Sequence, residues 1–147
     1  MRVLVWITDE AWRDAVDAAL PLLPDGAQLA VLCVASHEAE EAAQAPRAGL
    51  LGRHPKPPPP SEVRIGEQEA DRLLEAAAQR AGRPVERELR RGRPEDEVVA
   101  AARGADLLVL ARDGKPGPPG PKSLRPPTRF VLDHAPCAVL LAPAREH

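Results

Sequence analysis

Two short apolar segments near the end of the chain, residues 106–111 and 137–142, frame a Gly/Pro loop and a helix-like stretch near 126–134. Both segments have the length and the uninterrupted apolar character of strands that are buried on both faces. A strand that reaches the next strand through a helix pairs with it in parallel, because the crossover returns the chain to the same end of the sheet. The pattern therefore predicts a parallel α/β sheet.

The same alternation runs through the rest of the chain. Apolar runs at Val3–Ile7 and Ala27–Ala35, and a short alternating run at Val85–Leu89, predict three more strands. Apolar residues at helical spacing predict helices at 12–23, 36–44, 62–80 and from Pro94 onward. We expect an open, five-stranded, mostly parallel sheet with helices on both faces. It would form one domain over residues 1–147, with a Pro-rich linker at 46–61 and a Pro/Gly loop at 112–123.

Composition excludes two classes of partner. The net charge is -2 and aromatic residues make up 2 % of the chain, so little supports binding or stacking of nucleic acid. No apolar run approaches the roughly 18 residues of a transmembrane helix. The chain starts directly with a strand-like segment and shows no signal-peptide layout, which favours a cytoplasmic location.

Ligands of such sheets bind at the carboxyl ends of the strands. In this chain those ends carry polar or charged residues at 8–10, 36–37, 91–93 and 112–115. We expect Asp9 to cap the first helix. A phospho-accepting receiver domain would also hold Mg²⁺ with acidic residues there, but the chain lacks the acceptor aspartate and the late lysine that such a domain needs.

The loop at 112–123 has the position of a phosphate-binding loop but an unusual composition. Prolines at 116, 118, 119 and 121 have no N–H to donate, and the next helix begins near Pro126-Pro127. A phosphate group would depend on charged side chains instead, those of Arg112, Lys115, Lys122, Arg125 and Arg129. The other interpretation is a stiff, solvated loop with no ligand.

No nucleophile or metal site is evident in the sequence. His134 and Cys137 lie close together, but no third group accompanies them, so a structural histidine is favoured. Cys33 and Cys137 lie in apolar runs, which predicts two reduced core thiols rather than a disulfide. The segment Pro55–Pro60 could dock into an aromatic-lined groove or serve as a passive linker.

Three segments carry a family resemblance. They are the ending Arg129–Leu141, the opening strand with its acidic turn at Val3–Glu10, and Gly92-Arg93-Pro94-Glu95 before a helix. With them the chain resembles the universal stress protein family over nearly its whole length. The resemblance implies a Rossmann-like fold of the adenine nucleotide α-hydrolase-like type. It also implies a homodimer built through the last strand, residues 137–142.

ATP-binding members of this family carry a Gly-x-x-Gly and, further along, a Gly-Ser/Thr pair. On this chain the first two glycines fall on Ala111 and Gly114, and the later pair falls at 124–125 or 125–126, where neither residue matches. The family's adenine-side aspartate falls on Thr8 or Asp9. With the basic side chains of the loop included, the candidate nucleotide-site residues are Thr8, Asp9, Gly92, Arg112, Gly114, Lys115 and Arg125.

These observations predict a non-catalytic stress-response or regulatory module with no cofactor and no ATP. The alternative is a member that binds ATP or AMP, with Mg²⁺ and slow or no hydrolysis. It would use Asp9, Arg91, Gly92, Gly114 and the Arg/Lys side chains of the 112–125 loop. An enzyme of the wider α-hydrolase-like superfamily is disfavoured, because no acid/base pair or nucleophile stands at the strand ends.

Overall fold

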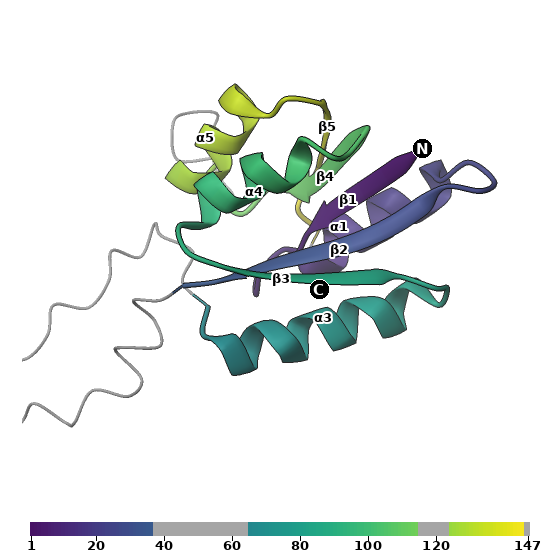
Figure 1. Cartoon of the computed structure of the whole chain (residues 1–147), viewed down its shortest axis with the longest axis horizontal. Helices are drawn as coiled ribbons and strands as arrows, with labels where there is room; N and C mark the ends of the chain where they lie inside the picture. Colours follow the sequence, from purple (N-terminus) through teal and green to yellow (C-terminus); the bar gives the residue numbers. More distant parts are fainter. Residues whose placement is uncertain (37–64, 115–123, 146–147) are drawn as a thin grey trace, which may run out of the picture.

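The computed structural model describes residues 1–36, 65–114 and 124–145. Strands and helices alternate along them, as Figure 1 shows. In chain order the elements are β1 (Arg2–Trp6), α1 (Trp12–Ala19), η1 (Leu20–Leu22), β2 (Gln28–Ala35), α3 (Glu67–Ala81), β3 (Glu86–Arg91), α4 (Pro94–Ala102), β4 (Leu107–Ala111), α5 (Pro126–His134) and β5 (Ala138–Ala142).

The strands form one open five-stranded sheet in the order β3-β2-β1-β4-β5. All four pairings are parallel, so the predicted fold class is confirmed and the sheet is wholly rather than mostly parallel. The chain adds β2 and β3 on one side of β1, and then β4 and β5 on the other. The pair β1–β4 is consequently the point at which the order of the strands reverses.

Helices cover both faces of the sheet, with α3 and α4 on opposite sides in Figure 1. Alternate residues of β1 divide between two cores, because side chains alternate along a strand. Val3 and Val5 pack in the core under α1 and α3, whereas Leu4 and Trp6 pack in the core under α4 and α5. Each fully buried aliphatic side chain stabilises the fold by about 1.5–3 kcal/mol.

The two edge strands have opposite character. The outer strand β3 has the sequence ERELRR, and its charges pair with each other and with neighbouring elements. The other edge, β5, has the apolar sequence AVLLA and is only partly buried over residues 139–141. Charged edge strands resist pairing with another chain, whereas apolar edges invite it. The strand predicted at Val85–Leu89 is thus confirmed as β3, and it lies at an edge of the sheet.

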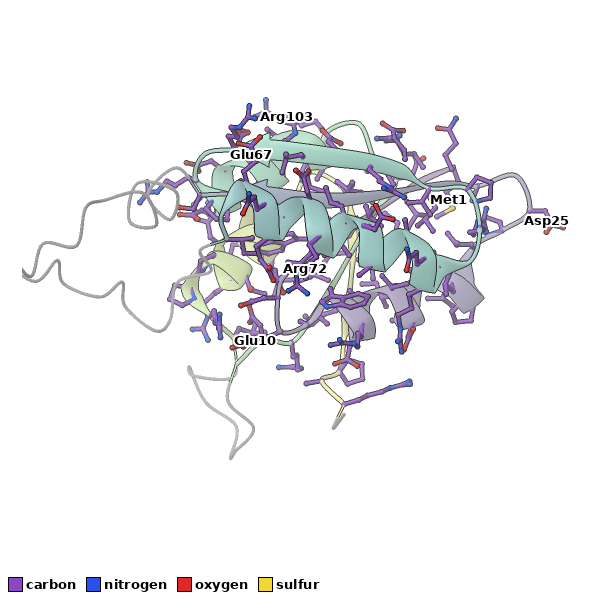
Figure 2. All side chains as sticks on the ribbon, turned by 90° about the horizontal axis from the view of Figure 1, so that it is seen from below. Met1, Glu10, Asp25, Glu67, Arg72 and Arg103 are labelled. Atoms are coloured by element: carbon purple, nitrogen blue, oxygen red, sulfur yellow. The ribbon has the colours of Figure 1, made fainter. Side chains whose placement is uncertain are left out.

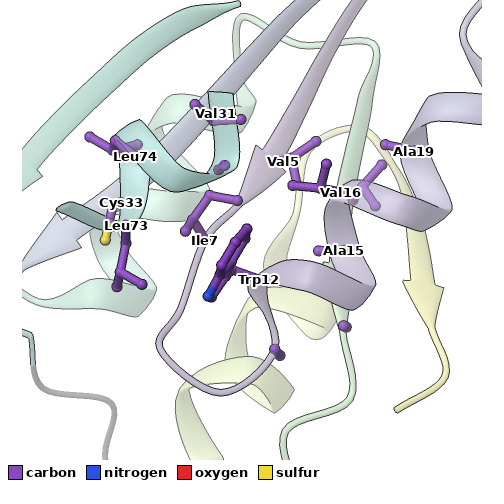
Figure 3. Packing of buried hydrophobic residues seen from close by; sticks show 14 of the residues in the cluster. Val5, Ile7, Trp12, Ala15, Val16, Ala19, Val31, Cys33, Leu73 and Leu74 are labelled. Carbon is purple, nitrogen blue, oxygen red and sulfur yellow. The ribbon is translucent and has the colours of Figure 1, made fainter. Parts of the chain in front are cut away.

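The expected helix cap at Asp9 is wrong. The helix α1 begins at Trp12, its N-cap position is Ala11, and no side chain caps it. Trp12 is 7 % exposed and its ring lies beside Ile7 in the core (Figure 3). Packing of this indole decides where the helix begins, and this outweighs the local preference for a capping aspartate.

Other boundaries shift by smaller amounts. The helix expected at 62–80 begins at Glu67, and Gly82 ends it in a left-handed conformation. Cys137 is partly buried and precedes β5, so only Cys33 is the fully buried core thiol that the sequence predicts. Both cysteines are unpaired.

Several predictions fall outside the described residues. They are the helix at 36–44 beyond Ser36, the linker at 46–61 with its Pro55–Pro60 segment, Lys115, and most of the loop at 112–123. Within the described ranges, no helix is both long enough and apolar enough to cross a bilayer.

Candidate functional site at the β1–β4 junction

The carboxyl ends of β1 and β4 lie side by side at the centre of the sheet. The segments that follow them lead into α1 and α5, which cover opposite faces. Figure 2 shows Glu10, just after β1, toward the same end of the molecule as Glu67 and far from Met1 and Asp25. Parallel α/β sheets place their ligands at this kind of position, so the predicted site has the expected place in the fold.

The first turn of α5 has few backbone donors to offer a ligand. Its N-cap residue is Arg125, and Pro126 and Pro127 follow it without an N–H group. The Arg125 N–H donates to Asp113 Oδ1 at 3.1 Å, and Thr128 Oγ1 donates to Asp113 Oδ2 at 2.5 Å. The Asp113 side chain comes from the end of β4 and is buried. A carboxylate of the chain itself therefore caps this helix.

The Arg125 guanidinium is also engaged. It forms an ion pair with Glu10, which follows β1, and its side chain is 18 % exposed. Glu10, Asp113, Arg125 and Thr128 thus join the segments after β1 and β4 to the start of α5. We call these four residues the junction cluster. Counting formal charges, two carboxylates and one guanidinium leave the cluster with an excess of negative charge.

Asp9 adds to this negative field. Partial loss of water around its side chain raises its pKa above the ordinary value, and the neighbouring Glu10 raises the pKa further, while Arg125 opposes both effects. Thr8, which precedes it, is buried. Of the predicted nucleotide-site residues, Thr8, Asp9 and Arg125 are accordingly brought together at the junction.

The other predicted residues are spread along the edge. The Gly92 N–H donates to the carbonyl of Ala35 at 3.1 Å, so Gly92 lies beside the end of β2 rather than at β4. Its φ is 137°, and a Cβ there would stand 3.3 Å from the Glu97 side chain. This glycine is explained by backbone geometry alone. The Arg112 N–H donates to the carbonyl oxygen of Ala142 at the end of β5, and the Arg112 side chain is exposed. Gly114 directly follows the buried Asp113.

The side chains of His134 and Cys137, considered for catalysis from the sequence, have ordinary surroundings. His134 Nδ1 lies 2.8 Å from the Phe130 carbonyl oxygen and its ring stacks on Phe130, which agrees with a structural role. Burial raises the pKa of the Cys137 thiol, which disfavours the reactive thiolate. Within the ranges that are described, no group of three or more His, Cys, Asp or Glu side chains could hold a metal ion.

Sequence reasoning missed Asp113 and Thr128, and it noted Glu10 without giving it a role. One signal was present. The Arg125 side chain has no oxygen that could accept a hydrogen bond from the start of the helix. An acceptor for the remaining N–H groups therefore had to come from another part of the chain. An aspartate directly after an apolar strand was a candidate, but its pairing with Thr128 spans 15 residues and depends on the tertiary fold.

Comparisons with known proteins agree with this architecture. No curated protein sequence matches significantly. Among solved structures, the hypothetical protein MJ0577, a test case for structure-based assignment of function, is 17 % identical with a TM-score of 0.68, over 99 % of this chain and 97 % of that one. A universal stress protein in complex with cAMP is 19 % identical with a TM-score of 0.65, over 99 % and 98 %.

UspA from Lactobacillus plantarum is 20 % identical with a TM-score of 0.57, over 97 % of both chains. At these identities the likeness shows a shared fold. The family itself rests on the sequence, because the model of the universal stress protein family matches residues 1–143. This match covers all of the described strands and helices, and by it the chain belongs to the universal stress protein family.

Proposed function

We propose that this member of the family is a non-catalytic stress-response or regulatory module of the cytoplasm that does not bind ATP. The observation that carries the proposal is the state of α5 at the β1–β4 junction. Its first turn contains two prolines, the Arg125 N–H already donates to Asp113, and the guanidinium of Arg125 already pairs with Glu10. A triphosphate needs several convergent donors and a positive field, whereas the described residues of this junction offer few free donors and carry two carboxylates, Glu10 and Asp113.

The alternative is a nucleotide-binding member that uses charged side chains in place of backbone amides. It is motivated by the basic residues of the 112–125 loop and by the retained Gly92 and Gly114. The family relative solved with cAMP adds that ligand to the nucleotides worth testing. Arg125 would have to leave Glu10 before it could contact a phosphate group.

Titration calorimetry with ATP, AMP and cAMP, each with Mg²⁺, separates the two proposals. We expect no heat of binding at millimolar nucleotide. A saturable isotherm would contradict the leading proposal. If ATP binds, Arg112→Ala and Lys115→Ala should each weaken it, whereas Gly117→Ala, a change in the same loop that removes no charge, should have little effect.

We further propose that the module is a homodimer through its last strand. The apolar edge of β5, residues Ala138–Ala142, would pair with the β5 strand of a second copy, while the charged β3 edge stays in solvent. A two-fold axis at this edge would make the two β5 strands antiparallel and would close the assembly at two copies.

Analytical ultracentrifugation over a range of concentrations tests the dimer. We expect a dimer for the wild type and a shift toward monomer for Val139→Lys, because the lysine places charge in the apolar edge. Leu22→Lys is the control, since Leu22 is 57 % exposed and lies in η1, outside the β5 strand. A monomer at every concentration would refute the dimer.

A further inference from the structure

We infer that the Asp113 carboxylate is a built-in anion, which occupies the N-terminal end of α5 and keeps free anionic groups, such as phosphate, out of the β1–β4 junction. This inference rests on the proposed function, because it names the residue responsible for the absence of nucleotide binding. It assigns Asp113 as a residue that determines specificity, with no role in catalysis.

The contacts of Asp113 are those of an anion bound to a helix N-terminus. One oxygen accepts the N–H of the N-cap residue Arg125 at 3.1 Å, and the other accepts the hydroxyl of Thr128 at 2.5 Å. Thr128 is the third residue of α5 and is 1 % exposed, so its hydroxyl has a fixed position in the packed interior. A free phosphate or carboxylate would seek this same pair of donors.

The donors at this end are also few. Among the N-cap residue and the first three residues of α5, only Arg125 and Thr128 have a backbone N–H, because Pro126 and Pro127 lie between them. Arg125 has given its N–H to Asp113, and the Arg129 N–H donates within the helix to the Arg125 carbonyl at 3.0 Å. An incoming anion therefore competes with Asp113 for the Arg125 N–H and the Thr128 hydroxyl.

Charge works in the same direction. The helix dipole and the Arg125 guanidinium attract an anion, but Asp113 already accepts the Arg125 backbone N–H and Glu10 already pairs with the guanidinium. A phosphate group brought to this place would face both carboxylates, and Asp9 stands close by. Of the carboxylates of Asp9, Glu10 and Asp113, only that of Asp113 is buried. It is also the one that accepts the Arg125 N–H and the Thr128 hydroxyl. Its removal should open the position.

The test is rescue of stability by small anions in the full chain. We expect Asp113→Ala to lower the melting temperature on the order of 5–10 °C, because two hydrogen bonds to a charged acceptor are lost. Phosphate at tens of millimolar should restore a large part of this loss, and acetate should do the same. Chloride at equal ionic strength should not. The wild type should show no phosphate-specific response.

Asp113→Asn is the matched variant, because its amide fills the same space and can still accept the Arg125 N–H. It should lose stability without regaining any in phosphate. If Asp113→Ala does not fold, Asp113→Ser replaces it with the same expected rescue, since serine is short and keeps one oxygen.

The inference is overturned if phosphate does not specifically restore the stability of Asp113→Ala, or of the Asp113→Ser variant that replaces it. It is also overturned if phosphate stabilises the wild type or Asp113→Asn as strongly as it stabilises that variant. Binding of ATP by the wild type would instead overturn the proposed function. If the wild type does not bind ATP and phosphate does not stabilise Asp113→Ala or Asp113→Ser, only the role given to Asp113 is removed.

Discussion

Burial separates the chemistry of the two thiols. Cys33 lies in the core under α1 and α3, and desolvation raises its pKa to about 12, whereas Cys137 is partly buried and its pKa is raised without such an extreme environment. We expect Cys137 to react slowly with iodoacetamide at pH 8 and Cys33 to react only after unfolding. Mass spectrometry of the labelled peptides measures both rates. Labelling of Cys33 in the folded chain at the rate of Cys137 would contradict the packing.

Asp9 gives a pH dependence of known sign. Its pKa is raised in the folded chain, chiefly because neighbouring protein atoms displace part of the water around this surface carboxylate. The folded state therefore holds this proton more tightly than the unfolded state, and stability falls as the pH rises through the folded pKa. Asp9→Asn should raise the free energy of unfolding modestly at pH 7, and the gain should vanish in acid, where Asp9 is protonated in both states.

Urea unfolding over a pH series measures this difference. Asp25→Asn, at the exposed turn near the opposite end of the molecule, is the control and should give no comparable gain. An Asn variant less stable than the wild type at pH 7 would show that the Asp9 charge is used by the fold.

Single residues also mark the boundary of what the sequence can predict. The positions of Thr8, Asp9 and Arg125 at the central edge follow from the order of strands. The shortage of backbone donors at the start of α5 can be predicted from Pro126 and Pro127 in the sequence. The partners of Arg125 are not visible. Glu10 and Asp113 lie 115 and 12 residues away from it along the chain, and only the folded sheet brings them to one helix end.

At the scale of elements, two turns depend on glycine. Gly82 ends α3 with a φ of 64°, and Gly92 joins β3 to α4 with a φ of 137°. A Cβ at position 82 meets open space, whereas one at position 92 presses on Glu97, which pairs with Arg90 at 3.5 Å. Alanine should therefore destabilise by about 1 kcal/mol at position 82 and by about 2–3 kcal/mol at position 92.

Chemical denaturation of the two variants measures both values. Gly104→Ala is the control, because Gly104 has no positive φ and a Cβ there makes only an ordinary contact at 3.9 Å. Its free energy of unfolding should stay within about 0.5 kcal/mol of the wild type. An equal loss at positions 82 and 104 would contradict the role of the left-handed turn.

Helices and strands are predictable where the local sequence determines them. Four apolar runs and one alternating run identify the five strands to within two residues, and Pro94 and Gly82 fix a helix start and a helix end. The start of α1 could not be predicted in this way. The burial of Trp12 against the sheet decides it, and that contact involves residues from other elements.

At the scale of the whole molecule, the parallel sheet of the family surrounds a β1–β4 junction in which Glu10 and Asp113 contact Arg125. The sheet order places that junction at the centre, and helices on both faces hold it in register. Glu10→Gln would free the Arg125 guanidinium without touching the cap from Asp113. It should not by itself create ATP binding, because Asp113 still holds the Arg125 N–H and the Thr128 hydroxyl. Titration calorimetry of this variant checks that expectation.

The most direct test of the account is the small-molecule content of the purified protein. Heat extraction of the freshly isolated chain, followed by chromatography of the extract, measures any adenine nucleotide carried from the cell. We predict an extract that contains no more nucleotide than that of a matched unrelated protein purified in parallel. Adenine nucleotide recovered at near one molecule per chain would contradict the claim that Asp113 and Glu10 occupy the groups a phosphate chain would need.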